Sequence, residues 1–164
     1  MKKITLSLNT GSIDGAIKEL NEYRAWVKRK TKQLTERLAM IGAQEATVRF
    51  SRAYYTGKND VSVNVEPTKN GWKITAEGEA VCFIEFGAGV YYNGTEPYPI
   101  DRPSGVVGIG EYGSGRGKQD SWVYNDESGE PVWTHGTPAA MPMYYATREM
   151  EQEILTIARE VFKD

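Results

Sequence analysis

Cysteine and histidine are almost absent from this chain of 164 residues, which contains one of each, Cys82 and His135. One cysteine cannot form an internal disulfide, and one cysteine with one histidine is too few for an ordinary Cys/His zinc site. A single histidine without a nucleophile motif beside it is weak evidence for a hydrolase. We therefore predict no catalytic residues, no cofactor and no bound metal, and we expect Cys82 to be a small buried hydrophobe.

Long hydrophobic runs and an excess of one charge are also missing. The longest uninterrupted apolar run spans Ala80 to Ile84, and the net charge is −2. A membrane-spanning helix needs about 20 apolar residues, and a general nucleic-acid binder usually has a basic excess. The residues after Lys2 and Lys3 alternate, unlike the apolar stretch of a secretion signal. We expect a protein with no membrane contact, made in a cytoplasm and kept there or in an assembly built there.

The composition that is present is that of a folded protein. Apolar residues make up 40% and charged residues 26% of the chain, as in ordinary globular domains. The length predicts a single domain over residues 1–164.

Hydrophobic periodicity predicts two long helices. Apolar residues recur three, four or seven positions apart from about Ser12 to Ala53, and again from about Pro142 to Phe162. Gly42 costs about 1 kcal/mol inside a helix and marks a candidate bend or break. The residues expected to face the core are Ile13, Ile17, Leu20, Val27, Leu34, Leu38, Ile41 and Val48 in the first helix, and Met143, Met150, Ile154, Ile157 and Val161 in the second.

Alternating patterns predict strands, and Asn70-Gly71 is a favoured hairpin turn between two of them. The segment 80–86 is apolar on both faces, which favours a central strand. The expected strands are 3–8, 61–65, 72–76, 80–86, 122–124 and 131–133. We predict an α+β fold in which an antiparallel sheet of about four to six strands is packed on one face by both helices.

A long glycine-rich loop is expected over residues 87–121. Gly108-Ile-Gly110-Glu-Tyr-Gly113 has the letters of a dinucleotide fingerprint, but the glycines that follow do not favour the helix that such a site needs. Long loops in compact domains are usually functional or become ordered on binding. Four tyrosines of this loop are candidate interface anchors, namely Tyr91, Tyr92, Tyr98 and Tyr112.

Charged residues supply two further candidates. Arg24, Lys28 and Lys32 share one helix face because they are four residues apart. This basic face is either a solvated surface or a contact with an acidic protein surface or with passing DNA. Glu85 interrupts an apolar segment, and we expect it to lie at an edge or to anchor a loop by accepting amides of a neighbouring glycine turn.

Three features together resemble one protein family. The first is the long N-terminal helix, and the second is Phe83-Ile84-Glu85-Phe86-Gly87-Ala88-Gly89, which is similar to a hydrophobic-Glu-Phe-Gly-Thr signature. The third is the segment 136–146, which is similar to a Pro-Phe-hydrophobic-x-x-Ala sequence that opens the final helix. The chain thus resembles the tail-completion (minor tail, head–tail joining) proteins of long-tailed double-stranded-DNA bacteriophages. Ala88 replaces the usual Thr, and Met143 replaces the usual Phe.

This resemblance implies a non-enzymatic structural component of a virion, made in the host bacterial cytoplasm and placed at the neck or upper tail. Members form part of a homo-oligomeric ring, commonly six-fold, between the capsid connector and the tail tube. DNA passes through the lumen of the ring without sequence-specific binding. The residues that match the family motifs are Phe83, Glu85, Phe86, Gly87, Pro142, Met143 and Ala146.

Two other functions stay open on the sequence alone. Aromatic residues in the loop, with Arg102, Arg116 and Lys118, are suited to a binding module for glycan or single-stranded nucleic acid. A hydrolase that uses His135 with an acid is the weakest alternative, because no nucleophile motif accompanies the histidine.

Overall fold

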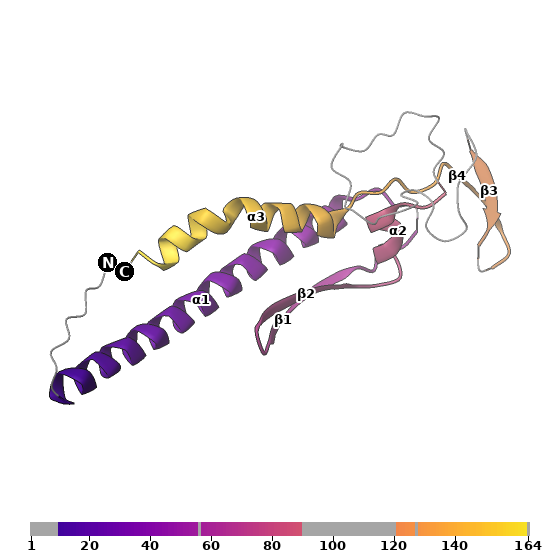
Figure 1. The fold of residues 1–164 in the computed structure, drawn as a ribbon. Helices are drawn as coiled ribbons and strands as arrows, with labels where there is room; N and C mark the ends of the chain where they lie inside the picture. The colour runs from indigo at the N-terminus through magenta and orange to yellow at the C-terminus, as the bar shows by residue number, and fades with distance from the viewer. Residues whose placement is uncertain (1–9, 56, 90–120, 127, 164) are drawn as a thin grey trace.

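The computed structural model describes residues 10–55, 57–89, 121–126 and 128–163. The elements, in order, are α1 (Thr10–Arg52), β1 (Ser62–Thr68), β2 (Gly71–Glu77), α2 (Val81–Phe86), β3 (Trp122–Asn125), β4 (Pro131–Thr134) and α3 (Pro142–Val161) (Figure 1). This is the predicted α+β fold, with two long helices and small antiparallel sheets. The predicted strand at 3–8 and the tyrosines Tyr91, Tyr92, Tyr98 and Tyr112 lie outside the described residues.

α1 is one continuous helix of 43 residues, so the break considered at Gly42 is wrong. Gly42 is buried where α1, β2 and α3 meet. A Cβ atom at this position would lie 2.5 Å from Sδ of Met150 and 2.9 Å from Cδ1 of Ile74. Glycine is therefore used here to let three elements approach closely, and the long helix tolerates its low helix propensity.

The core lies against the C-terminal half of α1, where α3, α2 and the β1–β2 hairpin all pack. Its fully buried members are Ala46, Phe50, Ala80, Ile84 and Ala146. Apart from Phe50 near its end, α1 enters this core with small residues rather than with the predicted stripe of large ones. Close approach of the backbones leaves little room on this face, whose buried residues are Ala39, Gly42, Ala43 and Ala46.

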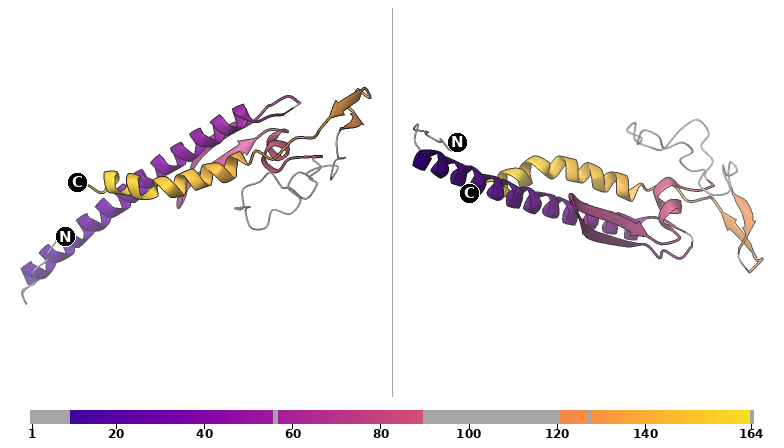
Figure 2. Two further views of the ribbon diagram at one scale, coloured as in Figure 1. Left: turned by 90° about the horizontal axis from the view of Figure 1, so that it is seen from above. Right: turned by 60° about the horizontal axis from the view of Figure 1, so that its bottom comes forward.

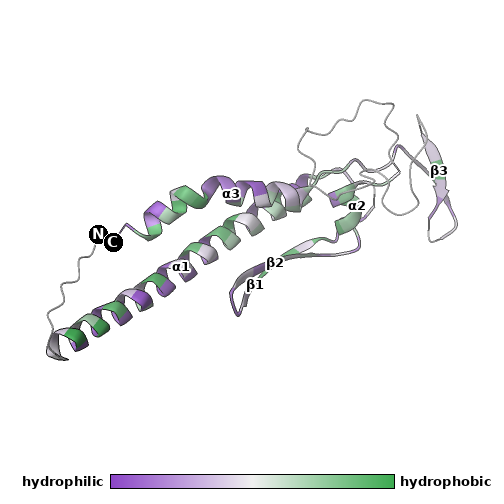
Figure 3. Cartoon of the chain, viewed as in Figure 1, coloured by the Kyte–Doolittle hydropathy of each residue, from purple (hydrophilic) through white to green (hydrophobic). Residues whose placement is uncertain are grey.

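The predicted apolar stripe of α1 is only partly correct. Val27, Leu34, Leu38, Ile41 and Val48 are half-buried, whereas Ile13, Ile17 and Leu20 are 44–54% exposed. The ring contact between Trp26 and Phe162, with centroids 5.6 Å apart, shows that α3 ends beside the middle of α1. The N-terminal part of α1 extends beyond α3 (Figures 1 and 2), and Figure 3 shows that its hydrophobic segments continue there. In α3, Ile157 and Val161 are buried as expected, but Ile154 is exposed.

The sheet is smaller than predicted among the described residues. β1 pairs with β2 and β3 pairs with β4, both antiparallel, and the two hairpins form separate two-stranded sheets. Both predicted hairpins are confirmed, including the turn between Thr68 and Gly71 that contains Asn70. The strands within 10–55, 57–89, 121–126 and 128–163 do not join into the predicted single sheet with both helices on one face.

Val81–Phe86 form helix α2, so the central strand predicted over 80–86 is wrong. Short apolar runs do not distinguish a buried strand from a buried helix turn. Two observations explain the outcome. Ala80 and Ile84, four residues apart, are both fully buried on one side of the helix. Just before α2, the carboxylate of Asp60 accepts hydrogen bonds from the amides of Glu79 and Ala80 at 2.9 and 3.0 Å, and these bonds lower the pKa of Asp60.

Candidate functional site

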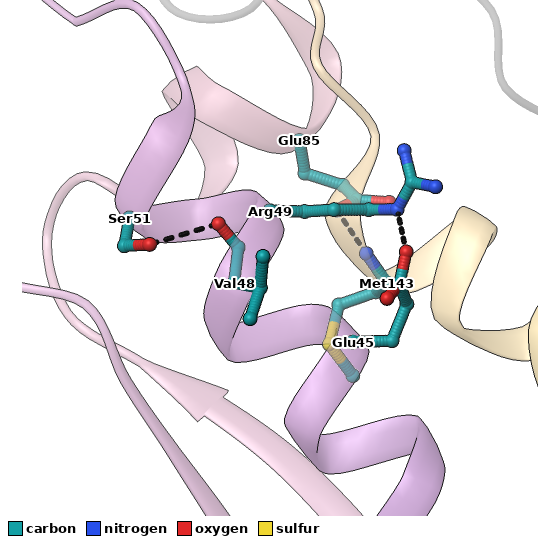
Figure 4. A network of polar contacts seen from close by, with 6 residues as sticks. All are labelled: Glu45, Val48, Arg49, Ser51, Glu85 and Met143. Carbon is teal, nitrogen blue, oxygen red and sulfur yellow. Dashed lines mark hydrogen bonds and ion pairs between the residues drawn. The ribbon is translucent and has the colours of Figure 1, made fainter.

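Glu85 connects the two motif segments that lie far apart in the sequence. Its Oε2 accepts a hydrogen bond from the amide of Met143 at 2.9 Å (Figure 4). Its Oε1 accepts one from the amide of Tyr144 at 3.2 Å. These amides belong to the first turn of α3, where a helix leaves its N–H groups without internal partners. The expected acceptor role is confirmed, but the expected donor, a glycine turn, is wrong.

Burial dominates the electrostatics of Glu85. The residue is only 8% exposed. Desolvation raises the pKa of its carboxyl group above the ordinary value, and the two amide hydrogen bonds oppose this effect only in part. A carboxylate also interacts favourably with the positive end of the helix dipole. Because both oxygens are held by amides, the arrangement fixes the start of α3.

The backbone around Glu85 pairs directly with the segment before α3. The amide of Ala140 donates to the carbonyl of Ile84 at 2.8 Å, and Ala88 and Thr137 exchange two hydrogen bonds of 2.8 Å. Gly87 has a φ of 73°, and a Cβ there would lie 2.6 Å from the amide nitrogen of Ala139. Only glycine fits this position without a backbone shift. The two motif segments therefore form one joined unit.

The other residues of the two motifs also contribute to this unit. Pro142 and Ala146 are buried, and Phe83, Phe86 and Met143 are half-buried. The ring of Phe83 stacks on Tyr55, with centroids 6.1 Å apart. Cys82 is half-buried on α2, so it is less buried than expected. His135 is exposed on the segment between β4 and α3.

Arg49 forms a second polar contact near this unit. Its Nε donates to Glu45 at 2.6 Å (Figure 4). Its guanidinium lies 4.5 Å from the centre of the Tyr145 ring. Arg49 and Glu45 are one helical turn apart on α1, while Tyr145 lies on α3. The contact between the Arg49 guanidinium and the Tyr145 ring therefore ties α1 to the first turns of α3.

The basic face of α1 lines a groove. Lys28 and Lys32 line a hollow of about 520 Å³ between α1 and the turn of the β1–β2 hairpin. Arg24 is exposed one helical turn further toward the N-terminus. The structure thus places two of the three predicted basic residues in one wall of the groove and leaves Arg24 beyond it.

Trp133 is an exposed aromatic residue that the sequence analysis did not single out. It is 74% exposed on β4, and its partner Val123 on β3 is 42% exposed. The sequence did indicate an exposed apolar face, because the strands 122–124 and 131–133 carry apolar residues on both of their faces. A two-stranded hairpin that packs with one face must leave the other face in water.

Comparisons of the chain with models of known protein families, with curated proteins and with solved structures gave no significant match. Within the described ranges, no group of three His, Cys, Asp or Glu side chains is placed to hold a metal ion. No helix in the described part of the chain is long and apolar enough to span a membrane.

Proposed function

We propose that the protein is a structural component of a bacteriophage virion, a tail-completion or head–tail joining protein. It forms part of a homo-oligomeric ring between the connector and the tail tube, through which DNA passes without sequence-specific binding. It is made in the cytoplasm of the host bacterium and acts in the neck or tail of the particle without enzymatic activity.

The observation that carries this proposal is the contact between the two motif segments. Phe83–Gly89 and 136–146 resemble two separate signatures of one family, and Glu85 of the first holds the first turn of the helix that the second opens. The two segments lie far apart in the sequence and occur in the order found in the family, and in the structure they contact each other directly. This agreement supports the resemblance beyond short matches of letters.

The surface properties also support an assembly role. A subunit of a closed ring needs two different and complementary surfaces. The described chain has an exposed apolar hairpin face and a groove at a different place. A net charge of −2 suits a conduit that lets DNA slide.

Electron microscopy of a phage lysate tests this function. The reading frame is deleted from the phage or prophage that encodes it, and the particles are counted with and without the intact chain supplied in trans. We expect separate DNA-filled heads and unattached tails in the deletion lysate, and joined particles after complementation. Normally joined particles in the deletion lysate would reject the joining role and favour a binding module for glycan or single-stranded nucleic acid.

A further inference from the structure

The β3–β4 hairpin presents an apolar face to water. Val123 and Trp133 are directly opposite in the antiparallel register, so their side chains lie on the same face. Both are exposed, Trp133 to 74%. The hairpin lies at the opposite end of the molecule from the N-terminal end of α1 (Figures 1 and 2). A tryptophan held by a paired strand is a typical anchor of protein interfaces.

The turn of the same hairpin is acidic and held by its own hydrogen bonds. Asp126 and Glu130 are exposed, and the sequence from Trp122 to Thr134 contains no lysine or arginine. Oδ1 of Asp126 accepts hydrogen bonds from the amides of Ser128 and Glu130 and from the Ser128 hydroxyl, at 2.6–3.0 Å. These bonds lower the pKa of Asp126, so it stays ionised at neutral pH. The hairpin therefore combines an apolar face with a negative tip.

A groove with the complementary pattern lies along α1. Its apolar part is a hollow of about 480 Å³ between α1, β2 and α3, lined among others by Leu38, Trp72, Ile74, Met143 and Met150. Pockets of about 300–1,000 Å³ hold small molecules, so an indole ring fits inside. Methionine side chains adapt readily to an incoming ring.

The basic hollow continues the apolar one. Thr35, Gly71 and Trp72 line both, and Lys28, Lys32 and Lys69 line only the second. Leu38, which lines only the apolar hollow, is six residues from Lys32, which is about 9 Å along a helix. On the hairpin, Asp126 is three residues beyond the Val123–Trp133 pair, which is about 10 Å along a strand. The apolar and charged parts of the two surfaces thus have matching spacing.

We propose that the β3–β4 hairpin of one copy of this chain docks into the groove of a second copy, with Trp133 in the apolar hollow and the acidic turn against Lys28 and Lys32. Within one copy the hairpin and the groove lie apart, so the contact is head-to-tail. A head-to-tail contact forms a ring when the rotation between copies closes. The inference rests on the proposed function in one respect, since it names the subunit contact that such a ring requires.

Sedimentation velocity of the purified full-length protein over a range of concentrations tests the contact. We expect concentration-dependent association that weakens as salt is raised. Trp133→Ala is expected to weaken association about tenfold or more. Tyr54→Ala, which removes another exposed aromatic side chain outside both surfaces, is the matched control and is expected to associate like the original chain. Circular dichroism melting establishes that each variant is folded.

Charge reversal tests the second half of the contact. The pair Lys28→Glu and Lys32→Glu is expected to reduce association, and adding Glu130→Lys is expected to restore part of it. Mixing the Trp133→Ala variant with the Lys28→Glu/Lys32→Glu variant gives a sharper result. Each retains one intact surface, so the mixture is expected to form a 1:1 heterodimer that cannot grow further.

Three results overturn the proposal: a wild-type chain that stays monomeric, folded Trp133→Ala protein that associates like wild type, or a mixture that forms no heterodimer. The second of these is also the result expected if another segment of the same chain fills the groove. The assay uses purified protein, whereas the joining function is tested by microscopy of the deletion lysate. Failure of the contact and failure of the function are therefore seen separately.

Discussion

At the scale of single residues, Glu85 is the most informative position. Its carboxylate is buried, and each of its oxygens accepts an amide hydrogen bond from the first turn of α3. A buried carboxylate with such partners positions one element against another, whereas one without them would be strongly unfavourable. Glu85 is thus the residue whose loss should separate α2 from the start of α3.

Glu85→Ala is expected to destabilise the protein by about 2–4 kcal/mol, because it leaves the amides of Met143 and Tyr144 without an acceptor in a buried place. The free energy of unfolding is measured by urea denaturation. Glu36→Ala, at an exposed position of α1, is the control and should change stability by less than about 0.5 kcal/mol. Equal stability of the two variants would contradict the role assigned to Glu85.

The raised pKa of Glu85 predicts a pH dependence of stability. Because the folded-state pKa lies above the unfolded value near 4.5, the folded protein binds a proton more tightly than the unfolded chain. The part of the stability that comes from this tighter proton binding is therefore fully present below pH 4.5 and is lost as pH rises through the folded-state pKa. The unfolding free energy of wild type minus that of Glu85→Gln, whose side chain does not titrate, should therefore decrease as pH increases from about 4 to 8. A difference that grows over this range would show that the amide bonds outweigh burial.

At the scale of elements, the two halves of α1 have different surroundings. Its C-terminal half is a packed core helix with small buried residues, including Gly42 against Met150 and Ile74. Its N-terminal part extends beyond α3 and leaves Ile13, Ile17 and Leu20 exposed. Apolar side chains are therefore exposed at the N-terminal end of α1, whereas small residues are buried in its C-terminal half.

Gly42→Leu and Gly15→Leu form a matched pair for this difference. A leucine at 42 collides with Met150 and Ile74 and should destabilise by about 1–3 kcal/mol through overpacking. A Cβ atom at Gly15 would have no neighbouring atom within 4 Å, so leucine there should stabilise the helix by up to about 1 kcal/mol. Thermal melts followed by circular dichroism compare the two. A stabilising effect at 42 would mean that α1 and α3 are packed less closely than the contact between Gly42 and Met150 requires.

At the scale of the whole molecule, the chain is elongated, with α1 and α3 side by side and the β3–β4 hairpin at one end (Figures 1 and 2). The residues on either side of the segment 90–120 are in contact, because Nε1 of Trp122 donates to the carbonyl of Gly89 at 2.9 Å. The bridge between Ala88 and Thr137 adds a second contact between the chain before this segment and the chain after it.

Replacing residues 90–120 by a short glycine-serine linker is expected to leave a folded protein that no longer supports assembly. The expectation follows because Gly89 and Trp122, which flank the segment, are in direct contact, so a short linker can join them. Circular dichroism and a melting curve test folding, and complementation of the deletion phage tests assembly. Loss of folding in this variant would show that the segment is part of the core, and full complementation would show that assembly does not need it.

The sequence by itself determined the two long helices, both hairpins and the amide-accepting role of Glu85. These features depend on local periodicity, on turn residues such as Asn70-Gly71, and on the need of a buried carboxylate for donors. The short motifs at 83–89 and 136–146 resemble two signatures of one family, but the sequence did not predict that they touch.

Only the tertiary structure decided which apolar residues are covered. Burial depends on where the neighbouring elements end: α3 stops beside Trp26, so the predicted stripe of α1 is left open toward its N-terminus. Val81–Phe86 became a helix because Asp60, distant in sequence, holds the amides before it. The exposure of Trp133 has the same origin, since the β3–β4 hairpin stands at one end of the molecule (Figure 1) and both Trp133 and Tyr124 are left exposed to water.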